Sequence, residues 1–557
     1  MKDEEESFIS RLSASAIGAI RDVWLIWLTL VLLTTLPYVA AALRTPSHQV
    51  FSGVLSAYDD TFTYYAWMRE GANGHLLMCD PFTSEPQRCE FFLPLWGVLG
   101  FVSRVTHISI PLTFHIARLV ASLFLLVVAR AVTRTVMKSR GRVRLSLWLY
   151  VLSGGFGWLV YLLQNAGDLF GATRAWGSAD LNLPEAIAFR SVFSQVHFTV
   201  GVILVAGAIN IFFRALVENK QSRALLAGVL VSLLAVVHPY MVFVVCAVAG
   251  VAFLLLPRLE RKSETARETY YSTAKPIVAF ILGTLPGVAY SVYLSFSNEV
   301  LREWLRVTDT FSPKPWEYAL GFGIVGALAI AGYRLLWNQY VPYGRLLLIW
   351  AVVHAALLYA PMSIQRRFIE GLQLPLAIAA AAALHWIARR GFKGSAAARN
   401  RKIFLTCAIG FASLTNAGFW VGQMLARGTA SGATDPRRYL DSDLTAAFDW
   451  LRANAQSDAV LFSSYLTGNV APSMTGLRVF LGHYAQTLNS DEKGAETTAF
   501  YTNALNDETA RKIFAEHRVR YVIYGPFEST ISSMFVPPDW LSVAYSSGGV
   551  SVFEVNQ

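Results

Sequence analysis

The chain alternates between long apolar runs and short polar segments over most of its length. A transmembrane helix needs roughly 20 mostly apolar residues, and fewer when other helices enclose it. The pattern therefore predicts about eleven such helices, and residues 23–425 are expected to form one membrane domain. The predicted spans are 23–43, 112–136, 144–163, 191–215, 223–238, 240–257, 275–296, 317–337, 344–361, 368–388 and 403–425.

Basic residues concentrate in the connections that follow the second, fourth, sixth and tenth predicted spans. The segment 389–402 alone holds six Lys or Arg residues. Because cytoplasmic loops carry an excess of Lys and Arg, these connections are predicted to be cytoplasmic. The amino-terminal residues 1–22 then lie in the cytoplasm as well. Their acidic start and the long first span favour a retained signal anchor over a cleaved signal peptide.

The run 224–256 decides the orientation of everything after it. Both of its flanks are basic, which favours a helical hairpin that turns at His238-Pro239-Tyr240. Pro239 has no N–H and disfavours helix at the preceding residue, so a break is expected there. A single kinked span is the alternative, and it would place the basic segment 389–402 outside.

Residues 426–557 change character after the last span and are predicted to lie outside the cytoplasm. Helical periodicity at 442–454 and 507–517 alternates with β-rich runs, and Ser-Ser-Gly-Gly separates the last two runs as in a hairpin. Alternating helices and strands predict a small α/β domain. The expected strands are 459–462, 478–482, 520–524, 540–545 and 550–555.

Composition agrees with this picture. Of the 557 residues, 54% are hydrophobic and only 15% are charged, as in a multi-pass membrane protein. The net charge of +10 lies mainly in the predicted cytoplasmic connections, which argues against nucleic acid as a partner. Cys79 and Cys89 lie in the first outer loop, where an oxidising compartment would allow a disulfide; two free thiols are the alternative.

That outer loop, residues 44–111, carries two adjacent carboxylates, Asp59 and Asp60. The aromatic residues and Met68 that follow have helical spacing, which indicates a short helix lying on the bilayer surface. Two adjacent carboxylates repel unless a cation or hydrogen bonds hold them. One interpretation is a functional acidic pair, and the other is helix capping, since Asp is a common N-cap.

A pair of arginines, Arg366 and Arg367, falls between two spans on the predicted outer side. Arg is disfavoured there, so the pair indicates either a phosphate site or side chains that reach anionic headgroups. His238 is a second candidate for a phosphate or proton, or a structural helix-end residue. Further ionisable residues expected on the outer face are Asp80, Glu85, Arg88, Arg190, His197 and Glu370.

No group of residues has the spacing of a metal site. Asp59 and Asp60 are nevertheless candidates for a divalent ion, because hard cations prefer oxygen ligands. The chain also lacks a Gly-rich phosphate loop on the predicted cytoplasmic side, which argues against a nucleotide-driven machine.

The chain resembles the GT-C class of polytopic glycosyltransferases. The resemblance rests on Tyr58-Asp59-Asp60, Tyr64-Tyr65-Ala66-Trp67-Met68-Arg69-Glu70-Gly71 and Asp80-Pro81-Phe82-Thr83-Ser84-Glu85-Pro86 after the first span. This loop is similar to the one that supplies the catalytic Asp in oligosaccharyltransferases, protein O-mannosyltransferases and aminoarabinose transferases. Gln365-Arg366-Arg367-Phe368 before Leu374-Pro375-Leu376, the number of spans and the terminal α/β domain also fit. A strict Asp-x-Asp is absent, which leaves metal dependence open.

The resemblance implies transfer of a sugar from a polyprenyl-phosphate donor to an extracytoplasmic glycan, lipid or protein. Such a reaction needs a base for the acceptor and cations for the departing phosphate. Asp60 is the expected base, because Tyr64 would share its helix face at i, i+4. Arg366 and Arg367, with His238, are expected to stabilise the phosphate.

Two other classes of function stay open at this point. A transporter or flippase for a lipid-linked or small substrate would carry charges at mid-membrane depth and an internal repeat. A non-catalytic envelope assembly protein would use the tail as a binding module. Replacing the acidic pair separates them, since an enzyme would lose turnover and a scaffold would tolerate the change.

Overall fold

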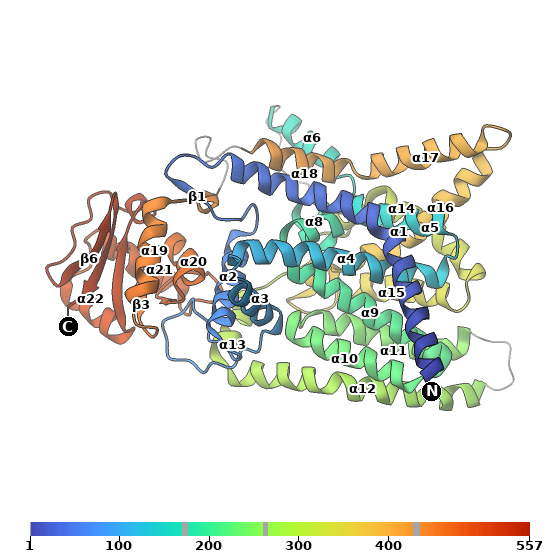
Figure 1. The fold of residues 1–557 in the computed structure, drawn as a ribbon, viewed down its shortest axis with the longest axis horizontal. Helices are drawn as coiled ribbons and strands as arrows, with labels where there is room; N and C mark the ends of the chain where they lie inside the picture. The colour runs from blue at the N-terminus through green and yellow to red at the C-terminus, as the bar shows by residue number, and fades with distance from the viewer. Residues whose placement is uncertain (1, 170–176, 260–265, 427–434, 557) are drawn as a thin grey trace. The chain divides into compact units, whose positions relative to one another are not determined.

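A computed structural model describes residues 2–169, 177–259, 266–426 and 435–556 (Figure 1). The chain divides into two compact units, each assembled from separate stretches of sequence. The first, here the helical unit, comprises Met1–Pro37, Arg118–Ser291 and Thr310–Gln423. The second, here the sheet unit, comprises Tyr38–Ala117, Val292–Asp309 and Met424–Gln557. The first outer loop therefore belongs with the carboxyl-terminal segment, a grouping that a simple division of the chain at residue 425 does not capture.

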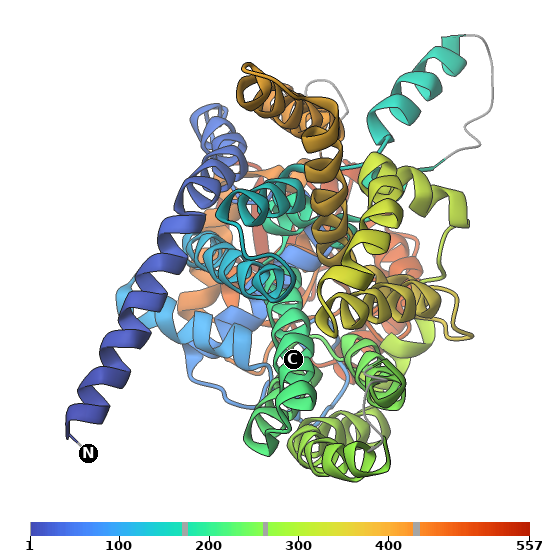
Figure 2. The ribbon, with the colours of Figure 1, turned by 90° about the vertical axis from the view of Figure 1, so that its right-hand side faces the viewer.

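The helical unit is built from long apolar helices, several of which are seen close to end-on in Figure 2. Helices α1, α4, α12 and α18 contribute residues to both units. The elements are α1 (Lys2–Leu43), α4 (Ile110–Val136), α5 (Arg140–Leu152), α6 (Gly157–Leu169), α7 (Ala179–Asn182), η1 (Pro184–Ala186), α8 (Ala188–Ser194), α9 (Val196–Glu218), α10 (Gln221–Val237), α11 (Met241–Leu259), α12 (Ala266–Ser297), α14 (Pro315–Gln339), α15 (Tyr343–Leu357), η2 (Gln365–Ile369), α16 (Gln373–Gly391), α17 (Ala397–Ala412) and α18 (Leu414–Leu425).

The helical unit contains the membrane spans. Among the described residues, seven helical segments are long and apolar enough to cross a bilayer, and an eighth is added if α17 and α18, bent by 55°, count as one. Three of the predicted spans correspond to apolar helices of 15–17 residues, Gln221–Val237, Met241–Leu255 and Tyr343–Leu357. The expected positions are thus occupied by helices, but a count of eleven full-length spans is not confirmed, because these three are shorter than a bilayer requires on their own.

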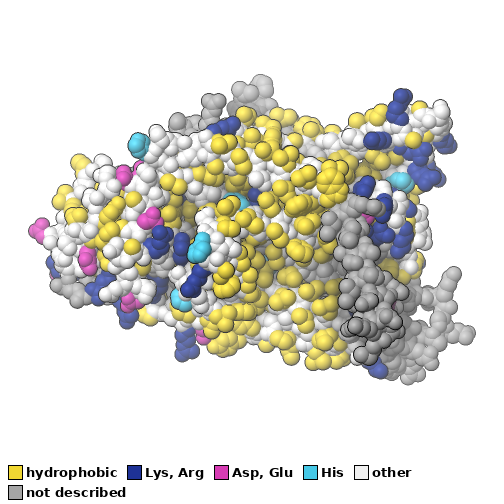
Figure 3. All heavy atoms as spheres, in the orientation of Figure 1, with side chains coloured by type: hydrophobic (Ala, Val, Ile, Leu, Met, Phe, Trp, Pro, Cys, Tyr) yellow, Lys and Arg dark blue, Asp and Glu magenta, His cyan; other side chains and the backbone are white. Residues whose placement is uncertain are grey.

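The surface of the helical unit agrees with a lipid environment. Hydrophobic side chains cover the visible face of its helices, and large ones are widely exposed, as at Ile330 with 72% of its surface accessible (Figure 3). Lys and Arg gather where α16 and α17 meet (Figure 3). An apolar surface of this extent is typical of contact with lipid, and the protein is a multi-pass membrane protein.

The turn at Pro239 is a hairpin, as predicted. Helix α10 ends at Val237 and α11 begins at Met241. Further along, Ser232 Oγ donates to the Gly283 carbonyl and Ser291 Oγ donates to the Ala235 carbonyl. Helices α10 and α12 therefore run in the same direction, so the intervening α11 must carry the chain back across the bundle. The kinked single span is excluded.

Small residues allow the helices of this unit to approach closely. A Cβ on Gly332 of α14 would overlap the carbonyl oxygen of Ala379 in α16, and a Cβ on Gly228 of α10 would overlap the backbone of α12. Close approach of this kind is a common basis of helix association in membranes, where the hydrophobic effect does not drive helices together.

The sheet unit contains a five-stranded mixed sheet with helices, and the carboxyl-terminal segment that forms this sheet is orange and red in Figure 1. The strand order is β4-β3-β5-β7-β6; β3 is parallel to β4 and β5, whereas β7 is antiparallel to β5 and β6. The predicted α/β domain is therefore present. The elements are β1 (Gln49–Phe51), α2 (Tyr58–Asn73), α3 (Pro94–Thr106), α13 (Glu299–Val307), η4 (Pro436–Arg438), β2 (Tyr439–Asp441), α19 (Ser442–Asn454), β3 (Val460–Phe462), α20 (Tyr465–Thr475), β4 (Arg478–Val479), α21 (Ser490–Tyr501), α22 (Asp507–Glu516), β5 (Val519–Tyr524), η5 (Glu528–Thr530), β6 (Leu541–Ser547) and β7 (Val550–Val555).

The caps and core of this unit follow from its sequence. Asp441 accepts hydrogen bonds from the N–H groups of Asp443 and Leu444, and Asn506 accepts one from Thr509, so both predicted helices have side-chain N-caps. Aromatic rings fill the core, with Phe462 packed against Phe480 and Phe500 at 5.0 Å between ring centroids. Buried aromatic pairs of this kind add to the stabilisation from apolar burial.

The first outer loop is fastened to the carboxyl-terminal segment inside the sheet unit. Strands β1 and β2 form an antiparallel pair, although about 390 residues separate them in sequence. The Val479 N–H donates to the Pro81 carbonyl, which ties the same loop to β4. A disulfide joins Cys79 and Cys89 within the loop.

Candidate active site

Helix α2 carries the acidic pair and is positioned by the packing of its apolar face. Phe62, Tyr65 and Met68 are buried. Gly100 of α3 has no room for a Cβ, because the Met68 carbonyl oxygen occupies that space. The helix ends at Gly74, whose φ of 97° is left-handed and suits glycine. A short helix is confirmed for this stretch, but its apolar residues are buried within the unit, and this burial explains the spacing of the aromatic residues without a bilayer surface.

Neither aspartate is the N-cap of α2. Ala57 occupies the N-cap position, and no side chain caps the helix there. Asp59 and Asp60 lie in the first turn, where carboxylates are stabilised by the helix dipole. The capping interpretation is therefore wrong, because Asp59 and Asp60 lie two and three positions after the N-cap residue Ala57.

Asp59 is held by residues from the other end of the chain. Its Oδ1 accepts hydrogen bonds from Arg437 Nη1 at 2.8 Å and from the Tyr465 hydroxyl at 2.9 Å. Burial alone would raise the pKa of Asp59, but the Arg437 guanidinium and the Tyr465 hydroxyl outweigh it and hold the pKa below its usual range. Asp59 is thus a carboxylate in a fixed position at neutral pH.

The network continues beyond Asp59. Arg437 also donates to both carboxylate oxygens of Asp435, at 2.9 and 2.6 Å, and to Asn469 Oδ1 at 2.7 Å. Asn469 in turn donates to the Gly482 carbonyl. Arg437 is buried, so its pairing with two carboxylates offsets the cost of removing its charge from water.

Asp60 differs from its neighbour. Its side chain is exposed, and it lies one helix position further round α2. Tyr64, one turn later, stacks against Trp96 with 4.4 Å between ring centroids. The two aspartates therefore have separate environments, one fixed inside a network and the other exposed at the surface of the unit.

Within the segment 79–89, Glu85 contacts the carboxyl-terminal part of the sheet unit. Lys493 Nζ lies 2.6 Å from Glu85 and donates to Ser84 Oγ at 3.0 Å. Burial acts to raise the pKa of Glu85, but Lys493 overcomes this and keeps it low. Arg88 is exposed.

Asp80 is a buried carboxyl group. Its Oδ1 accepts the Phe82 N–H at 2.8 Å, and among the described residues no hydrogen-bond partner is found for its Oδ2. Burial raises the pKa of Asp80 to about 7. This group therefore titrates near neutral pH inside the loop, away from solvent.

Arg366 and Arg367 lie in η2 of the helical unit, and both side chains are partly exposed. Arg366 Nε is 3.9 Å from Glu185 Oε1, a distance longer than a hydrogen bond. The Arg367 guanidinium lies 5.0 Å from the centre of the Tyr240 ring. The 3-10 turn thus places two partly exposed guanidinium groups next to each other in the sequence.

His238 is buried and paired with a carboxylate. Its Nδ1 lies 2.9 Å from Glu370 Oε2, and Glu370 is fully buried. His197 lies next to it, with 5.5 Å between ring centroids. A role for His238 at a phosphate would have to use its other ring nitrogen, with Glu370 fixing the orientation of the ring. Arg190, a further candidate, donates to the Asp180 carbonyl and stacks on Phe419.

The fit of a divalent metal to the acidic pair is poor. Within the described part of the chain, no three His, Cys, Asp or Glu residues are grouped closely enough to hold an ion. Arg437 and Tyr465 both donate to Oδ1 of Asp59, so an ion bound by Asp59 would have to share this carboxylate with them.

Sequence reasoning missed the partners of Asp59. Arg437 and Tyr465 are 378 and 406 residues away from it, and no local pattern links them. One signal was present: Arg437 and Arg438 form a second Arg pair on the predicted outer side of the last span. Arg366 and Arg367 had been singled out for the same reason, because Arg is disfavoured on the outer side of a membrane protein.

Comparisons with solved structures identify the fold. ArnT from Cupriavidus metallidurans in the apo state superimposes with a TM-score of 0.53 over 97% of this chain and 98% of that chain, at 9% sequence identity. The chain has the GT-C fold. ArnT bound to undecaprenyl phosphate gives a TM-score of 0.52 at 9% identity, covering 95% and 97% of the two chains.

A second similar structure is an oligosaccharyltransferase from Archaeoglobus fulgidus, solved with a tethered acceptor peptide that contains the NVT sequon. It gives a TM-score of 0.51 at 13% identity and covers 91% of this chain and 70% of that chain. No protein-family model matches the chain, and no curated protein sequence matches it significantly. The likeness is therefore one of fold, as the resemblance in the sequence had implied.

Proposed function

We propose that the protein is a membrane glycosyltransferase that transfers a sugar from a polyprenyl-phosphate donor to an extracytoplasmic acceptor. The agreement with ArnT over nearly the full length of both chains carries the proposal, since one of those structures holds undecaprenyl phosphate. The exposed Asp60 beside a fixed Asp59, and the arginine pair in η2, supply groups of the kinds that such a reaction needs.

In the proposed reaction, Asp60 accepts the proton of the acceptor nucleophile. The nucleophile forms a bond to the anomeric carbon of the sugar while the bond from that carbon to the phosphate oxygen breaks. The lipid phosphate leaves as an anion, and its new charge is stabilised by Arg366 and Arg367. A positioned general base contributes typically 100-fold or more to a rate.

Asp59 and His238 have positioning roles in this scheme. Asp59 is anchored by Arg437 and Tyr465, so it fixes the first turn of α2 and with it the backbone of Asp60. His238 is anchored by Glu370 near Arg367, whose guanidinium stacks on Tyr240 at the same turn of chain. Rigid support of this kind keeps a reacting group within reach of its proton.

The proposal is tested by measuring cleavage of the bond between the sugar and the lipid phosphate. The purified full-length protein is reconstituted with a panel of polyprenyl-phosphate sugars and a membrane extract as the source of acceptor, and free polyprenyl phosphate is measured by mass spectrometry. We expect release that depends on both donor and extract, and that is lost in Asp60→Asn. Movement of the intact donor across the bilayer without bond cleavage would favour a transporter, and absence of donor binding would favour an assembly protein.

A further inference from the structure

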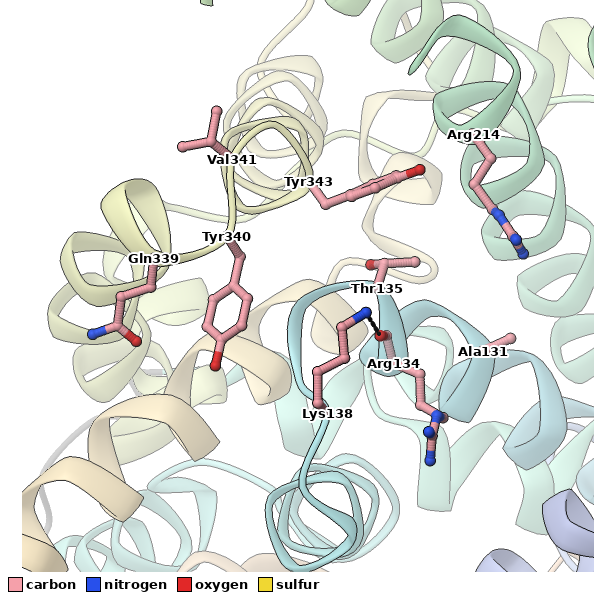
Figure 4. Close-up of a pocket in the computed structure, with 9 residues that line it drawn as sticks. All are labelled: Ala131, Arg134, Thr135, Lys138, Arg214, Gln339, Tyr340, Val341 and Tyr343. Atoms are coloured by element: carbon pink, nitrogen blue, oxygen red, sulfur yellow. Dashed lines mark hydrogen bonds between the residues drawn. The ribbon is translucent and has the colours of Figure 1, made fainter. Parts of the chain in front are cut away.

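A cavity of about 440 Å³ opens in the helical unit between the ends of α4, α9 and α14. It is lined by Arg134 and Lys138 at the end of α4, Arg214 of α9, Tyr340 after α14 and Tyr343 at the start of α15. Figure 4 shows these side chains, which come from separate helices, around one space. A single buried water needs only about 10–15 Å³ measured in the same way, so the cavity has room for a polyatomic anion and its hydration.

The lining is strongly basic. Among its residues, all of which are described, three are Lys or Arg and none is Asp or Glu. Glu218 lies close by, but three cations share it: Arg223 in direct contact, Arg214 at 3.6 Å and Lys220 at 3.9 Å. The Arg214 contact is longer than a hydrogen bond. One carboxylate therefore leaves an excess of positive charge around the cavity.

The cavity also lies at the height of a membrane surface. Helices α4, α9 and α14 are among the apolar segments long enough to span a bilayer, and each ends here, at Val136, Glu218 and Gln339. Val341 on the rim is apolar and 45% exposed. The charge pattern of the sequence predicts that this end faces the cytoplasm, where the leaflet is rich in anionic lipid.

We propose that this cavity binds a phosphate group, supplied by an anionic phospholipid or by a soluble phosphate compound. Lys138 and Arg214 provide the charge, while the hydroxyl group of Tyr343 provides a further donor to the phosphate oxygens. Basic cavities between helices at the cytoplasmic surface commonly receive such headgroups. This site is separate from the residues assigned to sugar transfer and does not rest on the proposed function.

The test uses the full-length protein in detergent and native mass spectrometry. Phosphatidylglycerol and phosphatidylcholine are titrated in parallel, and inorganic phosphate is added as a competitor. We expect one phosphatidylglycerol to bind more tightly than any phosphatidylcholine. Each cation near a surface contributes about 1 kcal/mol, which is about fivefold in affinity, so Lys138→Gln with Arg214→Gln should weaken that binding about 25-fold.

The matched control is Arg389→Gln with Lys393→Gln, which removes two exposed cations near the end of α16 that do not line the cavity. It should leave the affinity unchanged. If Lys138→Gln with Arg214→Gln folds poorly, the single variant Lys138→Gln, at an exposed position beyond α4, should still weaken binding about fivefold. Displacement by millimolar inorganic phosphate indicates a soluble ligand, and resistance to it indicates the lipid. No preference for phosphatidylglycerol and no phosphate binding, or equal losses in variant and control, would overturn the proposal.

Discussion

Two Arg-Arg pairs, one in each unit, lie in short 3-10 helices but in opposite environments. Arg437 and Arg438 in η4 are both buried, and Arg437 donates to two carboxylates and an amide. Arg366 in η2 keeps 35% of its side chain exposed, and its closest carboxylate is 3.9 Å away. The same dipeptide thus holds the structure together in one unit and presents charge to its surroundings in the other.

This difference distinguishes an arginine that stabilises the fold from the arginines that we assign to phosphate binding. A buried guanidinium without partners would be very costly, so the contacts of Arg437 are needed for folding. In η2, Arg366 is 3.9 Å from its carboxylate neighbour Glu185, and a phosphate is the kind of ligand that would complete the contacts of its guanidinium group. The comparison predicts that changes at Arg437 affect stability first, whereas changes at Arg366 and Arg367 affect activity first.

The largest effect is expected for Arg437→Met. This change keeps much of the side-chain volume but leaves Asp59 and Asp435 without their shared cation. Removing one member of a buried ion pair costs about 3–5 kcal/mol. Thermal unfolding of the purified protein should show a marked loss of stability, and activity per folded molecule should fall less. An unchanged melting temperature with lost activity would show that Arg437 acts in catalysis, which would contradict the structural role assigned to it in the comparison of the two arginine pairs.

Arg366→Gln with Arg367→Gln should act in the opposite way. Two hydrogen bonds to a charged phosphate contribute about 1.5–3 kcal/mol each, so kcat/KM for the donor should fall about 100-fold or more. The melting temperature should stay close to that of the unaltered protein. Arg390→Gln, which removes an arginine stacked on Trp386, is the control and should change neither quantity. Destabilisation without loss of turnover would show that η2 is structural.

Asp80→Asn tests whether the buried carboxyl group of Asp80 affects the stability of the protein and not its turnover. Because the pKa of Asp80 is raised from 3.8 to about 7, the folded state binds its proton more tightly than the unfolded state does. This contribution to stability is complete below about pH 4 and is lost as the pH rises to about 7. The neutral amide lacks that dependence, so the variant should gain on the order of 3–4 kcal/mol relative to the original protein between pH 4 and 8.

Thermal melting curves of Asp80→Asn and of the original protein, recorded between about pH 4 and 8, test this prediction. Parallel curves at every pH would mean that Asp80 is solvated in the working protein. A loss of turnover in Asp80→Asn, with stability unchanged, would instead indicate that Asp80 is part of the active site.

The smallest effect is expected for the disulfide. Cys79 and Cys89 close a short loop, for which chain entropy gives about 2–3 kcal/mol. Cys79→Ser with Cys89→Ser should lower the melting temperature modestly and leave kcat/KM nearly unchanged. Alkylation before and after reduction should reveal two additional thiols in the original protein; equal labelling would show that the bridge is absent.

Local patterns in the sequence predicted the elements well where one physical signal dominated. The apolar runs located the membrane helices, and the break at Pro239 located the hairpin, because proline removes a helix hydrogen bond. The lengths of the helices were predicted less well, since α10 and α15 are mostly apolar but are only 17 and 15 residues long. Helix α20 was missed because Gly468 and Pro472 both disfavour helix within it.

The candidate site depended on contacts that no local pattern encodes. The sequence placed Asp59 and Asp60 on a helix after the first span, but it could not reveal that Arg437 fixes one of them. Capping was a reasonable alternative until the helix was seen to begin at Tyr58. Likewise His238 was recognised as a candidate, whereas its burial against Glu370 follows only from the tertiary structure.

The central claim is that Asp60 is the catalytic base and Asp59 its fixed neighbour. The most direct measurement compares the single-turnover rates of Asp60→Asn and Asp59→Asn with the same polyprenyl-phosphate donor, both at saturating acceptor and with folding confirmed. We predict a loss of at least about 100-fold for Asp60→Asn and a smaller loss for Asp59→Asn, accompanied by lower stability. A rate for Asp60→Asn within a fewfold of the original protein would contradict the assignment.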